Sequence, residues 1–257
     1  QAASAASALD GRVYYNNYLI THTTPGRPVG SFWGLVTDGL FRTQAELDNS
    51  LPQFGYIIDP NQTWLGDVRF KDVKKDGKID AEDMTYIGSP IPKFTWGLTN
   101  SLNYKNFDLS VFFQGSHGAQ AYNFLRWQIE GMSNAWSNQL RTVMDRYTET
   151  NTGGSLPRFT NTNTNNTAMS DRYVEDASYW RVQNITLGYR LPAQVLKSIK
   201  SSNIRIYGSV QNLHTFTKYS GYDPEIGAFN NNIRLMNVDM GHYPNPRTFT
   251  IGANLEF

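Results

Sequence analysis

The sequence predicts an all-β protein whose antiparallel strands cross a membrane as part of a transmembrane β-barrel. Three observations lead to this fold class. Short segments alternate strictly between apolar and polar residues, the connections between them are of very unequal length, and 14% of the 257 residues are aromatic. The clearest segments are about nine to eleven residues long, which is the length that a tilted strand needs to cross a bilayer.

The best alternation lies between residues 94 and 115. Residues 94–104 place Phe94, Trp96 and Leu98 on one face and small polar residues on the other, and Asn100 alone breaks the apolar row. After Lys105-Asn106, residues 107–115 alternate in the same way. The two segments therefore predict a β-hairpin.

Further segments bring the expected strands to about six, together with one amphipathic helix between residues 122 and 147 that is broken near Gly131. The expected strands lie near 12–21, 94–104, 107–115, 179–190, 203–214 and 248–257, and the long loops near 22–93, 116–178 and 217–247. If the strands run up and down in order, every long loop falls on one side and the C-terminus on the other. Short periplasmic turns and long extracellular loops are typical of outer-membrane barrels.

Alternation alone is equally compatible with a soluble β-sandwich or barrel. Two details favour the membrane. The polar face consists of Thr, Gly, Ser, Asn and Gln, which suits a water-filled lumen, and aromatic residues gather near the strand ends, where membrane girdles lie.

Composition excludes several classes of protein. The chain has no cysteine, which excludes disulfide frameworks and zinc–thiolate sites, and 23 Lys+Arg against 22 Asp+Glu give a net charge of +1, which argues against a nucleic-acid partner. No apolar run approaches the roughly 18 residues of a membrane helix. Residues 1–10 lack the basic and apolar regions of a signal peptide, so we expect the chain to begin within a longer protein.

One segment carries a candidate metal site. Four aspartates fall at positions 1, 5, 9 and 12 of an EF-hand-like loop, with Gly77 at the turn: Asp72, Asp76, Asp80 and Asp83. Clustered carboxylates suit Ca²⁺, although Lys74 stands at position 3 and position 12 is the shorter aspartate. The alternative is a structural Asp-Gly turn whose carboxylates pair with neighbouring lysines.

Catalytic motifs are absent from the sequence. Asp223 and Glu225 flank Pro224 on a turn and need not converge on one bond, and the four histidines occur singly without metal-ligand spacing. We therefore expect no enzyme activity and no required cofactor.

Several ordered motifs resemble one family, the SusC/RagA-type TonB-linked (TonB-dependent) outer-membrane proteins of Bacteroidota, in their C-terminal portion. The matching runs are GDVRFKD from Gly66, DGKID from Asp76, IGSPIPKFTWG from Ile87, FDLSVFFQGS from Phe107, YWRVQNITLGY from Tyr179, QNL from Gln211, GYDPE from Gly221 and PRTF from Pro246. The resemblance covers about residues 25–257.

This resemblance implies part of an importer for oligosaccharides or peptides. The family has a barrel of about 22 strands, a plug domain that this chain lacks, a SusD-like surface lipoprotein as lid, and TonB–ExbB–ExbD as energy source through the plug. Phe257 resembles the terminal aromatic residue that the barrel-assembly machinery reads. Since six strands alone would leave open edges in lipid, the resemblance also implies that this chain cannot transport by itself.

The expected contacts with cargo or lid are aromatic residues in the long loops, because aromatic faces stack on sugar rings. They are Trp33, Phe41, Trp127, Trp136, Tyr219 and Tyr222. The alternative function is a secreted soluble glycan-binding module with a dockerin-like calcium loop.

Overall fold

The computed structural model describes residues 11–15, 18–132, 138–160, 165–198 and 201–256. Its contacts divide the chain into two compact units, which are considered separately. Unit 1 comprises Gln1–Ile91, Gln120–Glu175 and Glu225–His242, and unit 2 comprises Pro92–Ala119, Asp176–Pro224 and Tyr243–Phe257. No helix within the described ranges is long and apolar enough to span a membrane.

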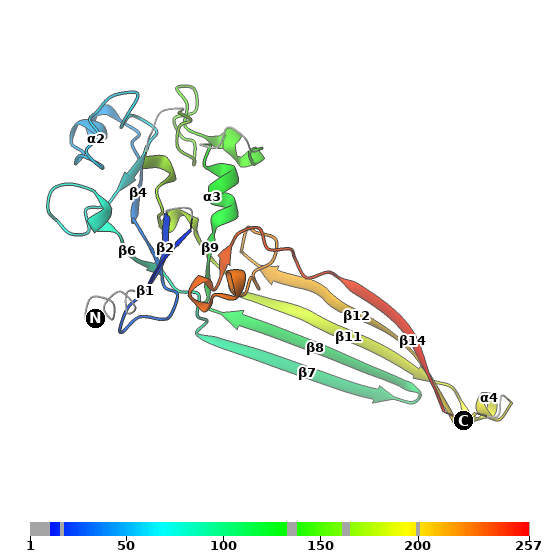
Figure 1. Ribbon diagram of the computed structural model, residues 1–257. Coiled ribbons are helices and arrows are strands. Elements are labelled where there is room, and N and C mark those ends of the chain that lie inside the picture. Colours follow the sequence, from blue (N-terminus) through cyan, green and yellow to red (C-terminus); the bar gives the residue numbers. More distant parts are fainter. Residues whose placement is uncertain (1–10, 16–17, 133–137, 161–164, 199–200, 257) are drawn as a thin grey trace. The chain divides into compact units, whose positions relative to one another are not determined.

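Unit 2 is an antiparallel sheet in the order β14-β12-β11-β8-β7 (Figure 1). Its strands are β7 (Phe94–Tyr104), β8 (Phe107–His117), β11 (Tyr179–Arg190), β12 (Asn203–Thr217) and β14 (Thr248–Glu256). A short helix, α4 (Ala193–Ser198), lies in the connection from β11 to β12. The strands predicted at 94–104 and 179–190 have those bounds, and those predicted at 107–115 and 203–214 extend further.

The turn between β7 and β8 is as short as the sequence indicates. Tyr104 pairs with Phe107, which leaves Lys105-Asn106 as a two-residue hairpin connection, and Lys105 adopts a positive φ of 53°. Two-residue hairpins commonly need such a backbone conformation because it matches the twist of the flanking strands. The hairpin prediction is confirmed.

The strand predicted at 12–21 is wrong. Its residues form two strands, β1 (Gly11–Tyr15) and β2 (Tyr18–Thr23), which pair antiparallel with each other in unit 1 and not with the five-stranded sheet. Tyr15 pairs with Tyr18, so the two halves of the predicted strand lie antiparallel to each other. The membrane-type sheet of the described chain therefore has five strands, not about six.

A β-bulge interrupts β11 near its middle. The pairing skips Gln183 between Val182 and Asn184, both toward β8 and toward β12. An extra residue shifts the alternation by one, so that Val182 before the bulge and Ile185 after it share a face. This shift explains why alternation along this strand is weak in the sequence.

Unit 1 is built from the predicted long loops, which form small sheets. β1 and β2 continue into β3 (Phe32–Gly34) and β6 (Thr85–Gly88); β4 (Thr37–Leu40) pairs with β5 (Val68–Phe70); and β9 (Gln120–Asn123) lies between β10 (Val174–Asp176) and β13 (Val238–Asp239). The α-helices are α2 (Gln44–Asp48) and α3 (Phe124–Glu130), and short 3-10 turns include η2 (Arg141–Asp145) and η4 (Asp171–Tyr173).

The predicted loop helix is present in part as α3. Asn123 caps its start by accepting a hydrogen bond from the N–H of Arg126 at 2.8 Å, and Gly131 follows its last residue. Side chains from distant segments bury two apolar clusters in unit 1. One contains Ile20, Phe32, Tyr122, Phe124, Met169, Tyr173, Leu235 and Val238, and the other Leu35, Leu40, Val68, Phe70 and Ile79. Each large apolar side chain contributes about 1.5–3 kcal/mol when fully buried, so these loops carry their own cores.

Candidate functional site

The two faces of the unit 2 sheet differ sharply in chemistry. Direct cross-strand partners point to the same face, so the register assigns each residue to a face. Two rows of the apolar face, read from β7 to β14, are Leu102, Leu109, Leu187, Gly208, Ile251 and Asn100, Val111, Ile185, Val210, Phe249. Two rows of the polar face are Ser101, Ser110, Thr186, Ser209, Thr250 and Asn103, Asp108, Gly188, Tyr207, Gly252.

The described residues leave the apolar face largely uncovered. Leu102 is 59% exposed, Phe249 70% and Ile251 89%. Soluble proteins rarely expose a contiguous apolar surface of this kind, because each buried methylene group gains about 0.8 kcal/mol on leaving water. A face with this composition suits contact with hydrocarbon.

Aromatic rows border the apolar face at both ends. One contains Trp96, Trp180 and Phe216, with the Trp180 and Phe216 rings stacked at 3.8 Å, and the other contains Tyr104, Phe107 and Tyr189. From Trp96 to Tyr104 a strand rises about 27 Å at 3.4 Å per residue. A tilt of 35–45° reduces this to about 19–22 Å, close to the roughly 25 Å apolar band of outer-membrane barrels.

The polar face carries a cross-strand ion pair that spans three strands. Arg205 of β12 donates from Nε to Asp108 of β8 at 2.9 Å, and Gly188 of β11 lies between them. A Cβ atom on Gly188 would come within 2.6 Å of both partners, so glycine is required for their close approach. We call this the β8–β12 ion pair.

The predicted cargo or lid contacts occupy different environments. Phe41 is fully buried and Tyr219 is 6% exposed, so both side chains pack inside their units and present no surface. Trp127 is half-buried in α3 and donates from its indole nitrogen to the Thr167 carbonyl at 2.7 Å. Tyr222 is 68% exposed in unit 2. Trp136 and Phe257 lie outside the described residues.

Trp33 of β3 lies in an aromatic pocket of about 440 Å³ in unit 1. Its lining includes Tyr14, Tyr18, Trp33, Phe54, Met84 and Met169. Tyr14 and Tyr18 are 56% and 38% exposed, so their ring faces are accessible. Strand β3, the β1–β2 hairpin and later segments form the walls of this pocket. It can accommodate a flat apolar surface such as a sugar ring or an aromatic side chain.

The Asp72–Asp83 loop is closed by its own hydrogen bonds. Asp72 accepts from the N–H of Gly77 at 2.9 Å, which is the main reason that its pKa lies below the ordinary value. Asp83 is buried and accepts from the N–H groups of Val73 and Asp80. The remaining carboxylates face ammonium groups, with Lys78 at 2.5 Å from Asp80 and Lys74 beside Asp76 and Glu82.

In this arrangement the loop does not fit a calcium ion. Ca²⁺ needs six to eight oxygen ligands directed at one point, whereas these oxygens accept hydrogen bonds from N–H groups and lysines. Within the described ranges, no group of three or more acidic, histidine or cysteine side chains is arranged to hold a metal ion. The geometry therefore favours the alternative, a structural Asp-Gly turn whose carboxylates pair with neighbouring lysines.

Sequence reasoning missed a buried polar cluster in unit 1. Arg158 donates to Asp67 from Nε at 2.7 Å and from Nη2 at 2.9 Å, and Asn166 donates to the same carboxylate at 2.9 Å. The Asn166 side chain also accepts from the N–H of Val68 at 2.8 Å. Asn166 and Leu156 belong to the Asn/Thr-rich segment 151–167, and both side chains are buried. We call these residues the Asp67 cluster.

Comparison with known proteins identifies relatives of this chain. No protein-family model matches it. It is 34% identical over 236 residues to TonB-dependent receptor P3 of Formosa agariphila, which is 90% of this chain and 22% of the relative. It is 28% identical over 210 residues to TonB-dependent receptor SusC of Bacteroides thetaiotaomicron, which is 81% of this chain and 19% of SusC. The chain thus spans about a fifth of the length of the curated relatives it matches.

Solved structures show the same fold. The RagAB peptide transporter matches 96% of this chain with a TM-score of 0.72 and 23% identity, and the match covers 24% of that chain. The closed-closed state of the RagAB peptide importer matches 96% of this chain with a TM-score of 0.66 and 22% identity, over 28% of that chain. By its sequence relatives, this chain belongs over about 90% of its length with the TonB-dependent receptors, of which SusC is one.

Proposed function

We propose that this chain supplies barrel strands and surface loops to an outer-membrane importer that takes up oligosaccharides or peptides. The observation that carries the proposal is the two-faced sheet of unit 2. Its apolar face, bordered by aromatic rows, suits lipid, and its polar face suits a lumen. The proposal agrees with the names of the sequence relatives and with the description of RagAB as a peptide transporter.

The exposed apolar face disfavours the alternative of a secreted soluble glycan-binding module. Such a module would have to cover this face with other parts of the chain or with a partner. The described residues instead leave Phe249 and Ile251 largely uncovered.

The partners follow from the same proposal. Strands β7 and β14 have one unpaired edge each in the described sheet, and in a bilayer these edges must pair with further strands of a barrel. In the proposed receptor a plug fills the lumen and connects to TonB–ExbB–ExbD, and a SusD-like lipoprotein covers the outward side. Long connections form the extracellular loops, and Phe257 at the periplasmic end serves barrel assembly.

The proposed role requires no catalysis by this chain. Asp223, one of the two carboxylates considered for acid–base chemistry, lies 2.6 Å from the guanidinium of Arg181, and both side chains are buried. An aspartate held in a buried ion pair is poorly placed to exchange protons with a substrate. This arrangement supports a structural role for the Asp223 turn.

Membrane behaviour of the receptor that contains this chain tests the proposal. We expect extraction from cells only with detergent, and faster migration in gel electrophoresis when the sample is not heated, as folded barrels show. A protein that is soluble without detergent and migrates identically with and without heating would contradict the proposal. Nutrient uptake by Tyr222→Ala and Trp33→Ala receptors then tests cargo contact, with unchanged uptake by both as the contrary result.

A further inference from the structure

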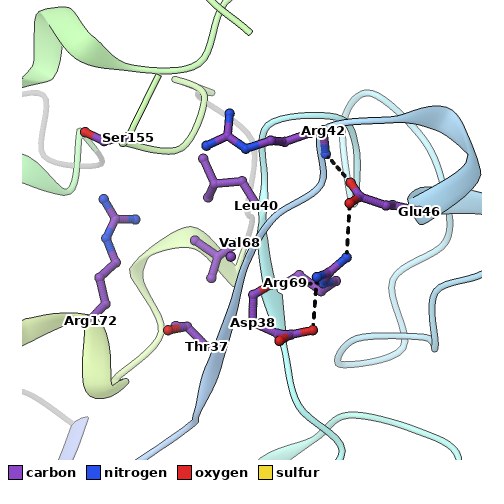
Figure 2. A pocket seen from close by; sticks show the side chains of 10 residues that line it. Thr37, Asp38, Leu40, Arg42, Glu46, Val68, Arg69, Ser155 and Arg172 are labelled. Carbon is purple, nitrogen blue, oxygen red and sulfur yellow. Dashed lines mark hydrogen bonds and ion pairs between the residues drawn. The ribbon is translucent and has the colours of Figure 1, made fainter. Parts of the chain in front are cut away.

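A second cavity in unit 1, of about 400 Å³, is lined by three arginines. They are Arg42, Arg69 and Arg172, and Asp38 and Glu46 are the acidic residues of the same lining. Figure 2 shows Arg69 joined to both acids on one side of the cavity, whereas Arg172 projects into it from the other side. The Arg69 ion pairs measure 3.0 Å to Asp38 and 3.5 Å to Glu46. The acids that line the cavity are thus already paired.

Arg172 is the lining arginine whose guanidinium the other described residues neither hydrogen-bond nor pair with an acid. Within the described part of the chain, its guanidinium makes no hydrogen bond or ion pair, and it lies 5.7 Å from the centre of the Tyr173 ring. Burial lowers its pKa from the ordinary value, which shows that its charge is costly in this position. A partly buried guanidinium has five N–H donors that need acceptors.

The acids nearest to Arg172 are engaged elsewhere. Asp171 accepts from the N–H and the hydroxyl of Thr37 at 2.9 and 2.7 Å. Glu130 accepts from Arg126 Nε at 2.5 Å and from a threonine hydroxyl, and Glu175 accepts from Arg126 Nη1 at 3.1 Å. The cavity therefore holds a positive charge that the described protein residues leave without a directly paired acid.

The backbone that carries Arg172 is held in place. Its 3-10 turn is tied to β4 by the Asp171–Thr37 bonds and to Leu35 by the Asp171 N–H at 3.0 Å. Arg42, across the cavity, donates through Nη1 and Nη2 to the backbone carbonyls of Thr152 and Gly154, so its side chain is fixed without an ion pair to a lining acid. A fixed guanidinium binds a carboxylate better than a mobile one, because less conformational entropy is lost.

We infer that this cavity is a subsite for a carboxylate group of the cargo, with Arg172 as its primary ligand-binding residue and Arg42 as the second positive charge. The inference rests on the proposed import function and names a class of substrate within it. The planar fork of arginine matches the two oxygens of a carboxylate. The C-terminus of a peptide and a uronate sugar both carry this group, and the experiment separates these two sources.

The test is isothermal titration of the full-length receptor in detergent with two matched pairs of probes. One pair is tetraglycine and its C-terminal amide, and the other is a galacturonate trimer and its methyl ester. We expect one of the acid forms to bind at least about tenfold more tightly than its neutral partner, and Arg172→Gln to abolish that preference. Arg172→Lys keeps the positive charge but lacks the planar guanidinium, so this variant should show part of the preference for the acid form.

Arg141→Gln is the matched control, because Arg141 is exposed in the same unit and does not line the cavity. Equal affinity for acid and neutral probes, absence of acid binding by the parent receptor, or an unchanged preference in Arg172→Gln would overturn the inference. Heat-dependent migration of the variant shows that it is folded. A receptor that inserts and imports a neutral cargo but shows no Arg172 effect would refute the subsite alone and leave the proposed function standing.

Discussion

An arginine placed at Val111 tests whether the apolar face of unit 2 meets lipid. Val111 lies on β8, the strand next to the β7 edge, and its row reads Asn100, Val111, Ile185, Val210, Phe249. Ser110 is the neighbouring residue on the same strand and belongs to the polar face. Val111→Arg and Ser110→Arg therefore add the same side chain to the two faces at nearly the same depth.

The magnitude follows from the position of the row. Asn100 is four residues from both Trp96 and Tyr104, so this row lies midway between the aromatic borders. Four residues correspond to about 14 Å along the strand and, at a tilt of 35–45°, to about 10–11 Å of depth. Arginine on a lipid face near the midplane costs about 2–4 kcal/mol. At 1.4 kcal/mol per factor of ten, Val111→Arg should lower the ratio of folded to unfolded receptor about 30- to 700-fold.

Guanidinium-induced unfolding of the full-length receptor in phospholipid vesicles, followed by tryptophan fluorescence, measures this ratio. We expect the midpoint to fall markedly for Val111→Arg and to change little for Ser110→Arg, because its guanidinium reaches the lumen side. Equal destabilisation by both variants, or a larger effect of Ser110→Arg, would refute the assignment of the faces.

Three further predictions concern glycine, the Asp67 cluster and the acidic loop. Gly188→Ala should separate the β8–β12 ion pair and cost about 1–3 kcal/mol in the same unfolding assay, whereas Gly208→Ala, whose added Cβ would come no closer than 4.0 Å to the Thr250 carbonyl, should be nearly neutral. Asp67→Ala should leave the buried charge of Arg158 without its carboxylate partner, at a local cost of about 3–5 kcal/mol. Hydrogen exchange should then become more than about 100-fold faster in peptides that cover residues 64–70, and unchanged exchange would show that the cluster does not stabilise this segment. Calcium titration should give no heat of binding with the parent protein and a measurable heat with Lys74→Asp, which removes an ammonium group and adds a carboxylate at position 3 of the loop. Strong calcium binding by the parent protein would contradict the argument that its carboxylates are already engaged.

The sheet of unit 2 was largely predictable because its signal is local. Most of its strands are long and alternate with a period of two, so that 94–104, for example, could be bounded from the sequence alone. The exception in β11 has a local cause as well, since the bulge at Gln183 shifts the alternation by one residue. The single strand expected at 12–21 was wrong because two strands of five and six residues are too short for their separate patterns to be recognised.

Unit 1 was not predictable to the same degree because its organisation depends on contacts between distant segments. β3 and β4 have three or four residues each, too few for a period to be recognised. In the Asp67 cluster, Asp67 binds Arg158 and Asn166, which lie 91 and 99 positions later in the sequence. Neither a residue type nor a spacing in the sequence marks Arg158 as the partner of Asp67.

The dependence of unit 1 on contacts between distant segments also explains why residue type was a poor guide to the binding site. Aromatic residues were chosen as contacts because they stack on sugars, yet in a folded unit the largest aromatic side chains also fill the core, as Phe41 does. Trp33 lines an accessible pocket because β3 presents it beside the β1–β2 hairpin, and that neighbourhood is a tertiary property. Nothing in the sequence distinguishes Arg172 from other arginines, which are common on protein surfaces. It becomes informative only when the structure shows that each acid near it is already bound to another donor.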